Sequence, residues 1–475
     1  MLAQTHSQPT PSEQWFDAWR PVVTESDLPV CQIEGELPRA LHGTLFRNGP
    51  SQRVLPYEGY EGLHVFEGDG LIHAFRIEDG QVRYRSRFVR DDAFVADERL
   101  GPSASNFLNF TVSNPSPDAP SRISHNTNVV WHAGRLLALV EADHPWSMDP
   151  RTLASGGRLP LCEQPLGMSV SAHPKIDGRS GQMIIHGYQP FAPYVQLYVV
   201  EPDGRCSLAE AIDTPYSVMM HDLAITEHYI VFLLCPLLFD VRPGQPFDEW
   251  VQWAPERGLK FGVRARTPGA AVRWFDAPTP GFMFHPGNAF EADGHILMDA
   301  CTYRDGAALV QSLSRLRRGE SVVAGGAVPF LYDLDLATGQ CRERQLDDRG
   351  AEFPRLDDRR VGYRNRFGYA FVGEGPDAFA PGRKAIVKFD REGGRSRYHR
   401  FAPGHFPGEP VFVPRTPDAA EDDGFVLVVV ADAPNERSYL AVLDAQNLDA
   451  APLARAHLDV RVPLGFHGNF AAGVV

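Results

Sequence analysis

The chain has 475 residues, and its 60 acidic side chains outnumber the 46 basic ones, which gives a formal net charge of −14. With 43% hydrophobic and 11% aromatic residues, the composition is that of a globular protein and excludes a chain that is disordered throughout. The acidic balance, without any run of lysine and arginine, excludes nucleic acid as a partner, because binding to phosphates requires a basic face.

Targeting and redox signals in the sequence indicate a cytoplasmic protein. Residues 1–15 are polar and lack the basic and apolar regions of a signal peptide. The longest apolar run, 229–239, is interrupted by Pro236 and is far shorter than the roughly 20 residues of a membrane-spanning helix. The six cysteines form no CxxC pair and are too sparse for a disulfide scaffold, which predicts a reducing compartment.

Short apolar runs separated by glycine and proline follow one another along the whole chain. Residues 71–77 and 81–85 flank an Asp79-Gly80 turn, which predicts a β-hairpin. Similar strand pairs are expected at 128–131 with 135–139, 182–185 with 197–200, 296–300 with 330–336, 384–390 with 396–401, and 425–431 with 439–444. Strand pairs spread this evenly favour radial repetition, as in a β-propeller, or a very large sandwich.

The length alone would suggest about three domains. No Pro/Ser-rich linker divides the sequence, however, so we predict a single domain over residues 1–475. Within it, residues 1–30 are expected to be an irregular lead-in. The stretch from about 235 to 262, which contains Trp250 and Trp253, interrupts the strand rhythm and is expected to be an insertion that caps one face.

Four of the seventeen histidines share an unusual setting, at the junction of an apolar segment with a Gly, Pro or Asp turn: His173, His221, His285 and His467. Their wide separation excludes a local finger-type zinc site, and only a closed fold could bring them together. A site made of imidazoles alone suits iron, copper, zinc or nickel, and not calcium or magnesium.

Metal-bound histidines usually donate their other ring N–H to a carboxylate or a carbonyl. Glu141, Glu352 and Glu409 lie in apolar, turn-flanked settings similar to those of the four histidines. From the residues alone, a solvent-exposed or salt-bridged role is more common for each of these glutamates than a place beside a metal ligand.

Several short motifs occur in one order, nearly from end to end of the chain: Phe46-Arg47-Asn48-Gly49-Pro50, Phe66-Glu67-Gly68-Asp69-Gly70, Ala172-His173-Pro174-Lys175, Met220-His221-Asp222, Glu352-Phe353-Pro354-Arg355, Glu409-Pro410-Val411-Phe412 and Phe466-His467-Gly468. In these motifs the chain resembles the carotenoid cleavage oxygenase family, which also contains a retinoid isomerase of the eye and stilbene-cleaving bacterial enzymes. The resemblance implies an all-β fold, a seven-bladed β-propeller with a helical and loop cap over an iron site on the axis.

The resemblance also assigns roles to individual residues. It implies one Fe(II) per chain, held by the four histidines named above, with Glu141, Glu352 and Glu409 orienting three of them. Thr127 matches a family threonine whose methyl group crowds an open iron position, which would leave one position for O2.

The activity that the resemblance implies is that of an oxidoreductase acting on a single donor with incorporation of O2. It would cleave a conjugated C=C bond of a carotenoid or apocarotenoid and release two carbonyl products, usually aldehydes. Cleavage of stilbene or phenylpropenoid alkenes by the same iron chemistry is an alternative. An isomerase or hydrolase on the same scaffold is a second alternative. A binding protein is the third, and retention of all four histidines speaks against it.

Two positions bear on the substrate. In the lignostilbene-cleaving branch a lysine and a tyrosine bind a phenol hydroxyl, and the corresponding residues here are Val140 and Phe94. Because a site without polar groups does not select a hydroxyl, we expect an apolar polyene as the substrate. Simple packing explains Val140 and Phe94 equally well.

The predicted cap bears on the partners. Residues 237–239 and 250–253 predict either an apolar patch at a tunnel mouth, in peripheral contact with the inner face of a membrane, or a buried rim of the cap. No protein partner is expected.

Overall fold

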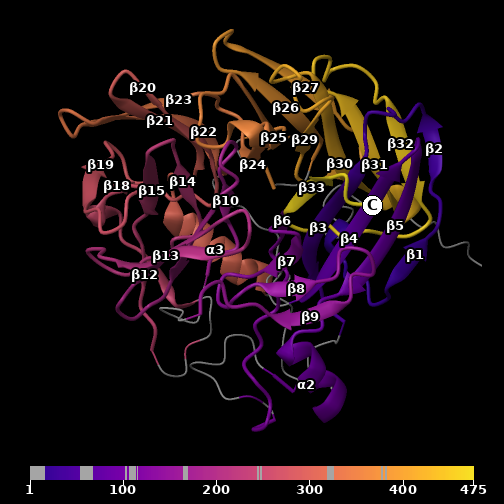
Figure 1. The fold of residues 1–475 in the computed structure, drawn as a ribbon, viewed down its shortest axis with the longest axis horizontal. Helices are drawn as coiled ribbons and strands as arrows, with labels where there is room; N and C mark the ends of the chain where they lie inside the picture. Colours follow the sequence, from indigo (N-terminus) through magenta and orange to yellow (C-terminus); the bar gives the residue numbers. More distant parts are fainter. Residues whose placement is uncertain are drawn as a thin grey trace, which may run out of the picture.

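The computed structural model describes residues 17–53, 68–101, 104–105, 114, 116–163, 170–242, 245, 249–317, 326–375, 378–379 and 382–475. In this part of the chain, seven sheets of four to six antiparallel strands surround a central axis (Figure 1). The seven-bladed β-propeller that the resemblance implied is therefore confirmed. Residues 1–16 of the expected lead-in, and Phe66 and Glu67 of one family motif, lie outside the described residues.

The first blade combines both ends of the chain in the order β33 (Gly468–Ala472), β3 (Gly43–Ser51), β4 (Asp69–Glu78), β5 (Gln81–Phe88) and β1 (Ser26–Leu28). The second and third blades follow the chain order: β6 (Asn128–His132), β7 (Arg135–Leu139), β8 (Trp146–Met148), β9 (Ser155–Arg158); then β10 (Lys175–Ile176), β11 (Met183–Tyr188), β12 (Val195–Val200), β13 (Cys206–Ile212).

The fourth to sixth blades also follow the chain order: β14 (Leu223–Ile225), β15 (Tyr229–Leu234), β18 (Lys260–Ala265), β19 (Val272–Asp276); β20 (Pro286–Ala292), β21 (His295–Thr302), β22 (Val328–Asp335), β23 (Cys341–Gln345); and β24 (Ala351–Arg355), β25 (Phe367–Gly373), β26 (Lys384–Asp390), β27 (Arg395–Arg400). The seventh blade contains β28 (His405–Pro407), β29 (Val411–Pro414), β30 (Gly424–Asp432), β31 (Arg437–Asp444), β32 (Ala454–Leu458) and β2 (Gln32–Gly35).

Two pairings between the chain ends close the ring. β33 pairs with β3 from Gly43 opposite Ala472 to Arg47 opposite Gly468, and β2 pairs with β32 in the last blade. These long-range pairings remove the exposed sheet edges that an open propeller would leave. They also fix the backbone just before β33, where His467 lies.

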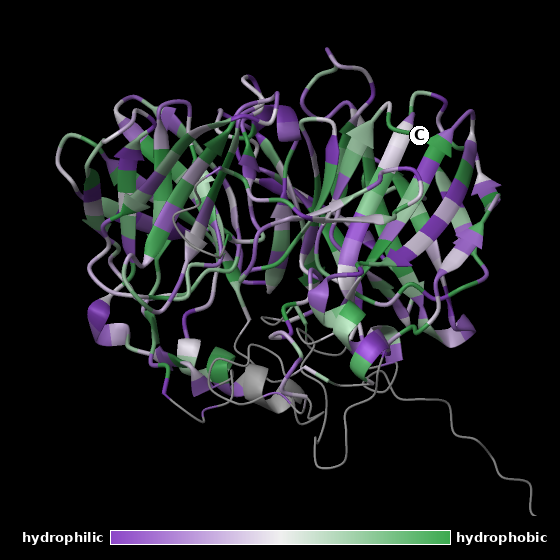
Figure 2. Cartoon of the chain, turned by 60° about the horizontal axis from the view of Figure 1, so that its bottom comes forward, coloured by the Kyte–Doolittle hydropathy of each residue, from purple (hydrophilic) through white to green (hydrophobic). Residues whose placement is uncertain are grey.

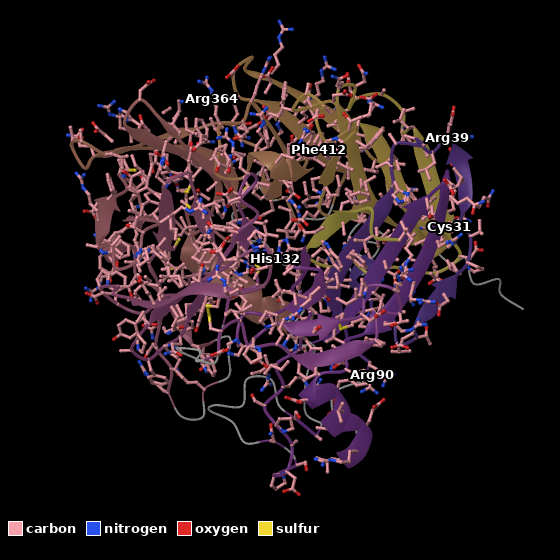
Figure 3. All side chains as sticks on the ribbon, viewed as in Figure 1. Cys31, Arg39, Arg90, His132, Arg364 and Phe412 are labelled. Carbon is pink, nitrogen blue, oxygen red and sulfur yellow. A yellow bond between two sulfur atoms is a disulfide. The ribbon has the colours of Figure 1, made fainter. Side chains whose placement is uncertain are left out.

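The core lies between the blades. All nine residues of β30 are buried on both faces of the sheet, whereas β5 alternates between buried and more exposed positions. A strand covered by neighbouring blades on both faces is apolar throughout, and a half-covered strand alternates. Side chains fill the spaces between the blades, and Arg39 lies at the outer edge of the ring (Figure 3).

The helices gather on one face of the propeller, below the strands in Figure 2. Helix α2 (Asp92–Leu100) begins where the Asp91 carboxylate accepts the N–H of Phe94 at 3.0 Å, an ordinary N-cap. Helix α3 (Gly306–Arg317) was not anticipated from the sequence. Short 3-10 turns lie at Pro255–Arg257, Asp358–Arg360 and Ala433–Asn435.

The stretch predicted as an insertion contains a separate two-stranded hairpin of β16 (Leu237–Phe239) and β17 (Val251–Trp253), before the chain returns to the fourth blade in β18. Leu237 and Trp250 are buried, and Trp253 packs so tightly on Gly306 of α3 that a Cβ there would lie 2.2 Å from the indole. These three side chains therefore form contacts inside the cap. No helix among the described residues is long and apolar enough to cross a membrane.

One disulfide differs from the expectation of reduced cysteines, because the structure joins Cys162 to Cys206. The two residues are 44 positions apart, and the segment after β9 packs against the third blade, where Cys206 begins β13, so that their Cα atoms lie 5.3 Å apart. Sequence spacing alone could not reveal this pair. Cys31, Cys235 and Cys301 are buried thiols, and Cys341 is half-buried.

Candidate metal centre

The four candidate histidines converge because each precedes the innermost strand of a different blade. His467 lies directly before β33 and His285 directly before β20, while His173 and His221 lie two residues before β10 and β14. Innermost strands such as β6, β10, β24 and β33 lie nearest the centre of the ring (Figure 1). One nitrogen from each of the four rings lies within 4.8 Å of the others.

The three candidate glutamates come from the remaining blades. Glu141 follows β7 of the second blade, Glu352 lies in β24 of the sixth, and Glu409 lies between β28 and β29 of the seventh. Each of the seven blades thus contributes one residue to the centre, either a histidine or a glutamate. This distribution explains why no local sequence pattern could define the site.

Each of three histidines turns its Nδ1 toward a glutamate. Nδ1 of His285 lies 2.6 Å from Oε2 of Glu352, Nδ1 of His467 lies 2.9 Å from Oε1 of Glu409, and Nδ1 of His221 contacts Oε1 of Glu141. An ionised carboxylate only accepts, so Nδ1 must carry the hydrogen and Nε2 keeps a free lone pair. This is the tautomer that binds a metal through Nε2.

The fourth histidine has a different neighbour. Nδ1 of His173 lies 4.0 Å from Oδ2 of Asp222, and the same oxygen accepts a hydrogen bond from Nζ of Lys175 at 2.7 Å. Burial raises the pKa of Asp222, against the opposing effect of the Lys175 charge. His173 is therefore positioned mainly by its packing against the other three rings, at centroid distances of 4.3 to 5.0 Å.

The donor set fits a transition metal. Nε2 of His173 and Nε2 of His285 are buried without a hydrogen-bond partner among the described residues. Leaving such an atom unsatisfied costs about 1–3 kcal/mol, so these atoms require a ligand. Burial lowers the pKa of His173 well below its usual value and also lowers that of His285, which keeps both imidazoles in the neutral form that binds metals.

The glutamates are held in turn by donors of their own. Oε2 of Glu409 accepts from Nη1 of Arg355 at 3.0 Å and from the backbone N–H of Gly468 at 2.9 Å. Burial alone would raise the pKa of Glu409, but Arg355 and His467 lower it to about 2. The N–H of Phe353 donates to Glu352 at 2.9 Å, and the Tyr188 hydroxyl donates to Glu141.

Sequence reasoning assigned no role to Arg355, Tyr188 or the Lys175–Asp222 pair. The sequence could have pointed to Arg355, because it lies in the family motif Glu352-Phe353-Pro354-Arg355. A β-bulge and the left-handed backbone of Phe353 (φ 52°) let Glu352 reach His285 while Arg355 reaches Glu409. No signal in the sequence marks Tyr188.

Aromatic rings close the site on two sides. The ring of Phe284 lies edge-on to His221 at 4.9 Å, and that of Phe353 edge-on to His467 at 5.2 Å. Such rings exclude water from the histidines while leaving no polar group to compete for the metal.

The other predicted site residues, Thr127, Val140 and Phe94, differ in how close they lie to the four histidines. Thr127 is next to it, because its carbonyl accepts the N–H of His467 at 3.2 Å. Val140 is buried immediately before Glu141. Phe94 packs with Leu71 and Phe88, away from the four histidines. A substrate role for Phe94 and Val140 stays a prediction.

Comparison with known proteins gives consistent matches over almost the whole chain. A family model described as retinal pigment epithelial membrane protein matches residues 19–472. The carotenoid 9,10(9',10')-cleavage dioxygenase 1 of Pisum sativum is 32% identical over 92% of this chain and 86% of its own length. The isoeugenol monooxygenase of Pseudomonas nitroreducens is also 32% identical, over 94% and 95% of the two chains. The crystal structure of cobalt-substituted Synechocystis ACO superposes with a TM-score of 0.88 at 29% identity, covering 98% and 99% of the two chains.

Proposed function

We propose that this chain is an Fe(II)-dependent dioxygenase. The premise is that the chain belongs to the carotenoid cleavage oxygenase family, whose family model is described as retinal pigment epithelial membrane protein. Its substrate would be a carotenoid or apocarotenoid, cleaved with O2 at one conjugated C=C bond. The observation that carries the proposal is the group of four convergent histidines, in which two buried Nε2 atoms have no hydrogen-bond partner in the part of the chain that the structure describes.

Iron is the metal that best combines this donor set with the chemistry of the relatives. The imidazoles alone suit iron, copper, zinc or nickel. The matched relatives are named dioxygenase and monooxygenase. A metal that activates O2 must change its oxidation state, and zinc does not. Bound here by His173, His221, His285 and His467, Fe(II) would supply the activation of O2.

The residues of this chain would supply geometry and a dry site. Glu141, Glu352 and Glu409 fix the tautomers of three histidines, and their charges offset part of the metal's +2 charge. Phe284 and Phe353 keep water away from the rings. One oxygen atom of O2 ends on each carbon of the broken double bond, so two carbonyl compounds form and no proton needs to be moved by the protein.

The apolar character of the two positions that recognise phenols elsewhere in the family supports a polyene substrate. Val140 and Phe94 offer no hydrogen-bonding side chain for a hydroxyl. Cleavage of a stilbene or phenylpropenoid alkene is the second candidate, because the isoeugenol monooxygenase matches at the same 32% identity as the carotenoid dioxygenase.

Incubation of the iron-loaded protein with carotenoids, apocarotenals, hydroxystilbenes and isoeugenol under 18O2 tests the proposal. We expect two aldehydes from a polyene, each with one 18O atom. A preference for hydroxystilbenes or isoeugenol would overturn the polyene assignment while supporting the dioxygenase. No cleavage of any alkene by protein that carries iron would overturn the dioxygenase itself.

A further inference from the structure

Tyr188, the last residue of β11, lies beside Glu141 at the metal centre. Its hydroxyl donates a hydrogen bond to Oε2 of Glu141, while Oε1 of the same carboxylate contacts Nδ1 of His221. The two oxygens of Glu141 are thus divided between the tyrosine and the histidine. The hydrogen bond at Oε2 restrains the rotation of the carboxylate and so keeps Oε1 against the histidine.

Glu141 needs such a restraint more than the other two glutamates do. Its side chain is 20% exposed, compared with 2% for Glu352 and 4% for Glu409. Glu409 is held by the charged Arg355, and Glu352 by the N–H of the residue that follows it, whereas the donor to Oε2 of Glu141 is a neutral hydroxyl from a neighbouring blade. Without that donor, water could compete for the carboxylate, because Glu141 is the most exposed of the three glutamates.

The tyrosine is itself held in place by the cap. The ring of Phe239, from the β16–β17 hairpin, stacks on the ring of Tyr188 at 6.0 Å with an angle of 22°. Burial, followed by the Glu141 charge, raises the pKa of Tyr188 well above its usual value, so the hydroxyl stays protonated and remains a donor. A row of contacts therefore runs from the cap hairpin through Tyr188 and Glu141 to His221.

We propose that Tyr188 is a positioning residue that holds Glu141, and through it His221, in the metal-binding orientation. Its effect on metal binding follows from the geometry of this row of contacts alone. Its effect on turnover rests on the proposed dioxygenase function.

The test compares Tyr188→Phe with Tyr84→Phe. Tyr84 is also buried, and its hydroxyl pairs with Nδ1 of His73 at 2.8 Å, so this control likewise removes a hydrogen bond of a buried tyrosine hydroxyl but leaves the centre untouched. Dissociation constants for Co2+ are measured by competition with a chelator. Removal of a partner that orients a metal ligand typically costs 10- to 100-fold in metal affinity. Because Tyr188 acts through Glu141, we expect about a tenfold weaker affinity for Tyr188→Phe, and the wild-type affinity for Tyr84→Phe.

A double-mutant cycle with Glu141→Gln separates positioning from general destabilisation. If Tyr188 acts through Glu141, the losses in Co2+ affinity are not additive, whereas residues that act independently give additive losses. An unchanged Co2+ affinity in Tyr188→Phe, or strictly additive losses in the cycle, would overturn the inference. If Tyr188→Phe fails to fold, Phe239→Leu removes the stacked ring instead; a weaker Co2+ affinity then supports the inference and an unchanged one overturns it.

The same measurements distinguish this inference from the proposed function. Loss of Co2+ affinity in Tyr188→Phe, in a protein whose wild type cleaves no alkene, would leave the inference standing and remove the dioxygenase. If the protein cleaves polyenes and Tyr188→Phe keeps the wild-type Co2+ affinity, the proposed dioxygenase function stands and this inference is overturned. In an active enzyme we expect kcat to fall in Tyr188→Phe with KM unchanged, because the role proposed for Tyr188 is to position Glu141 and His221 and not to bind the substrate.

Discussion

Oε2 of Glu352 lies 2.6 Å from Nδ1 of His285, although 67 residues separate the two in sequence and they belong to neighbouring blades. The contact is buried, with 2% of the glutamate side chain and 11% of the histidine side chain exposed. It fixes the tautomer of His285 and leaves its Nε2 without a partner among the described residues. The pair is therefore the clearest sign that this centre can hold a metal.

His285→Ala should remove both the metal and the activity. With one ligand of four missing, the remaining imidazoles leave a coordination position to water and the buried pocket is enlarged. We expect about one iron per chain in the wild type, as a single four-histidine site requires, and a strongly reduced content in the variant, measured by elemental analysis. His132→Ala is a matched control, because His132 is equally buried but bonds to the carbonyl of Gly181. Full cleavage activity in metal-free His285→Ala would contradict the assignment.

Glu352→Gln tests the outer carboxylate without changing its shape. The amide oxygen still accepts from Nδ1 of His285, but as a weaker acceptor and without the charge that makes the imidazole a stronger donor. We expect a loss of about 10- to 100-fold in metal affinity or in kcat. Glu343→Gln, whose carboxylate bonds Thr279 and Arg304 away from the centre, should behave as the wild type. Equal effects of the two variants would contradict the role of Glu352.

The sequence located the local features of this protein and missed the long-range ones. The predicted pair at 128–131 and 135–139 corresponds to β6 and β7, and the pair at 384–390 and 396–401 to β26 and β27. These predictions succeeded because the two strands of a hairpin and its turn are consecutive in sequence. The blade count came only from the family resemblance. Helix α3 is an exception among the local features, because Asp305 caps it through the N–H of Ala308 and its apolar residues recur at helical spacing, so the sequence could have predicted it. The Cys162–Cys206 disulfide has no local signature, because it depends on which segments the closed ring brings together.

Some residues of the metal centre could likewise be predicted from the sequence, and others could not. Its histidines and glutamates lie in motifs that can be read along the chain, and the structure brings these residues together from seven blades. Tyr188 could not be found, because it ends an ordinary strand and becomes relevant only when β11 of the third blade lies beside Glu141 of the second. Phe94 was chosen on a short motif, and its contacts lie in the packing between α2 and the first blade.

His73 should make the protein sensitive to acid. Burial, with the Arg47 charge as the second cause, lowers its pKa from 6.5 to about 3. The unfolded chain then binds a proton below pH 6.5 that the folded chain does not bind until pH 3, so stability falls as the pH falls through this window. At pH 4 the loss is about 3 kcal/mol. In His73→Asn, which does not titrate, Tm measured from pH 7 to pH 4 should fall less steeply than in the wild type, and parallel curves would contradict this.

Val140→Lys should alter the choice of substrate. Val140 is 8% exposed and precedes Glu141, so a lysine there places a cation in a nearly buried, apolar position. A buried unpaired charge is costly, and a phenol oxygen would relieve that cost, whereas a polyene would not. We expect the ratio of kcat/KM for hydroxystilbenes to that for apocarotenals to rise at least tenfold, a gain of about 1.4 kcal/mol in discrimination. Val140→Leu, which stays apolar, is the control. If the two variants keep the wild-type ratio, Val140 does not face the substrate.

Addition of the metal should stabilise the fold by an amount that depends on its free concentration. A ligand that binds only the folded state contributes RT ln(1 + [L]/Kd), or about 2.7 kcal/mol at 100 times Kd. The four imidazoles lie on different blades, so one ion connects the first, third, fourth and fifth blades and resists their separation. Calorimetry of chelator-treated protein should show Tm rising with added Fe2+ or Co2+ under anaerobic conditions. Ca2+ and Mg2+ should leave Tm unchanged, since they require oxygen ligands. An equal shift with Mg2+ would mean that the stabilising ion binds to carboxylates elsewhere, and no shift with Fe2+ or Co2+ would contradict a four-histidine metal centre.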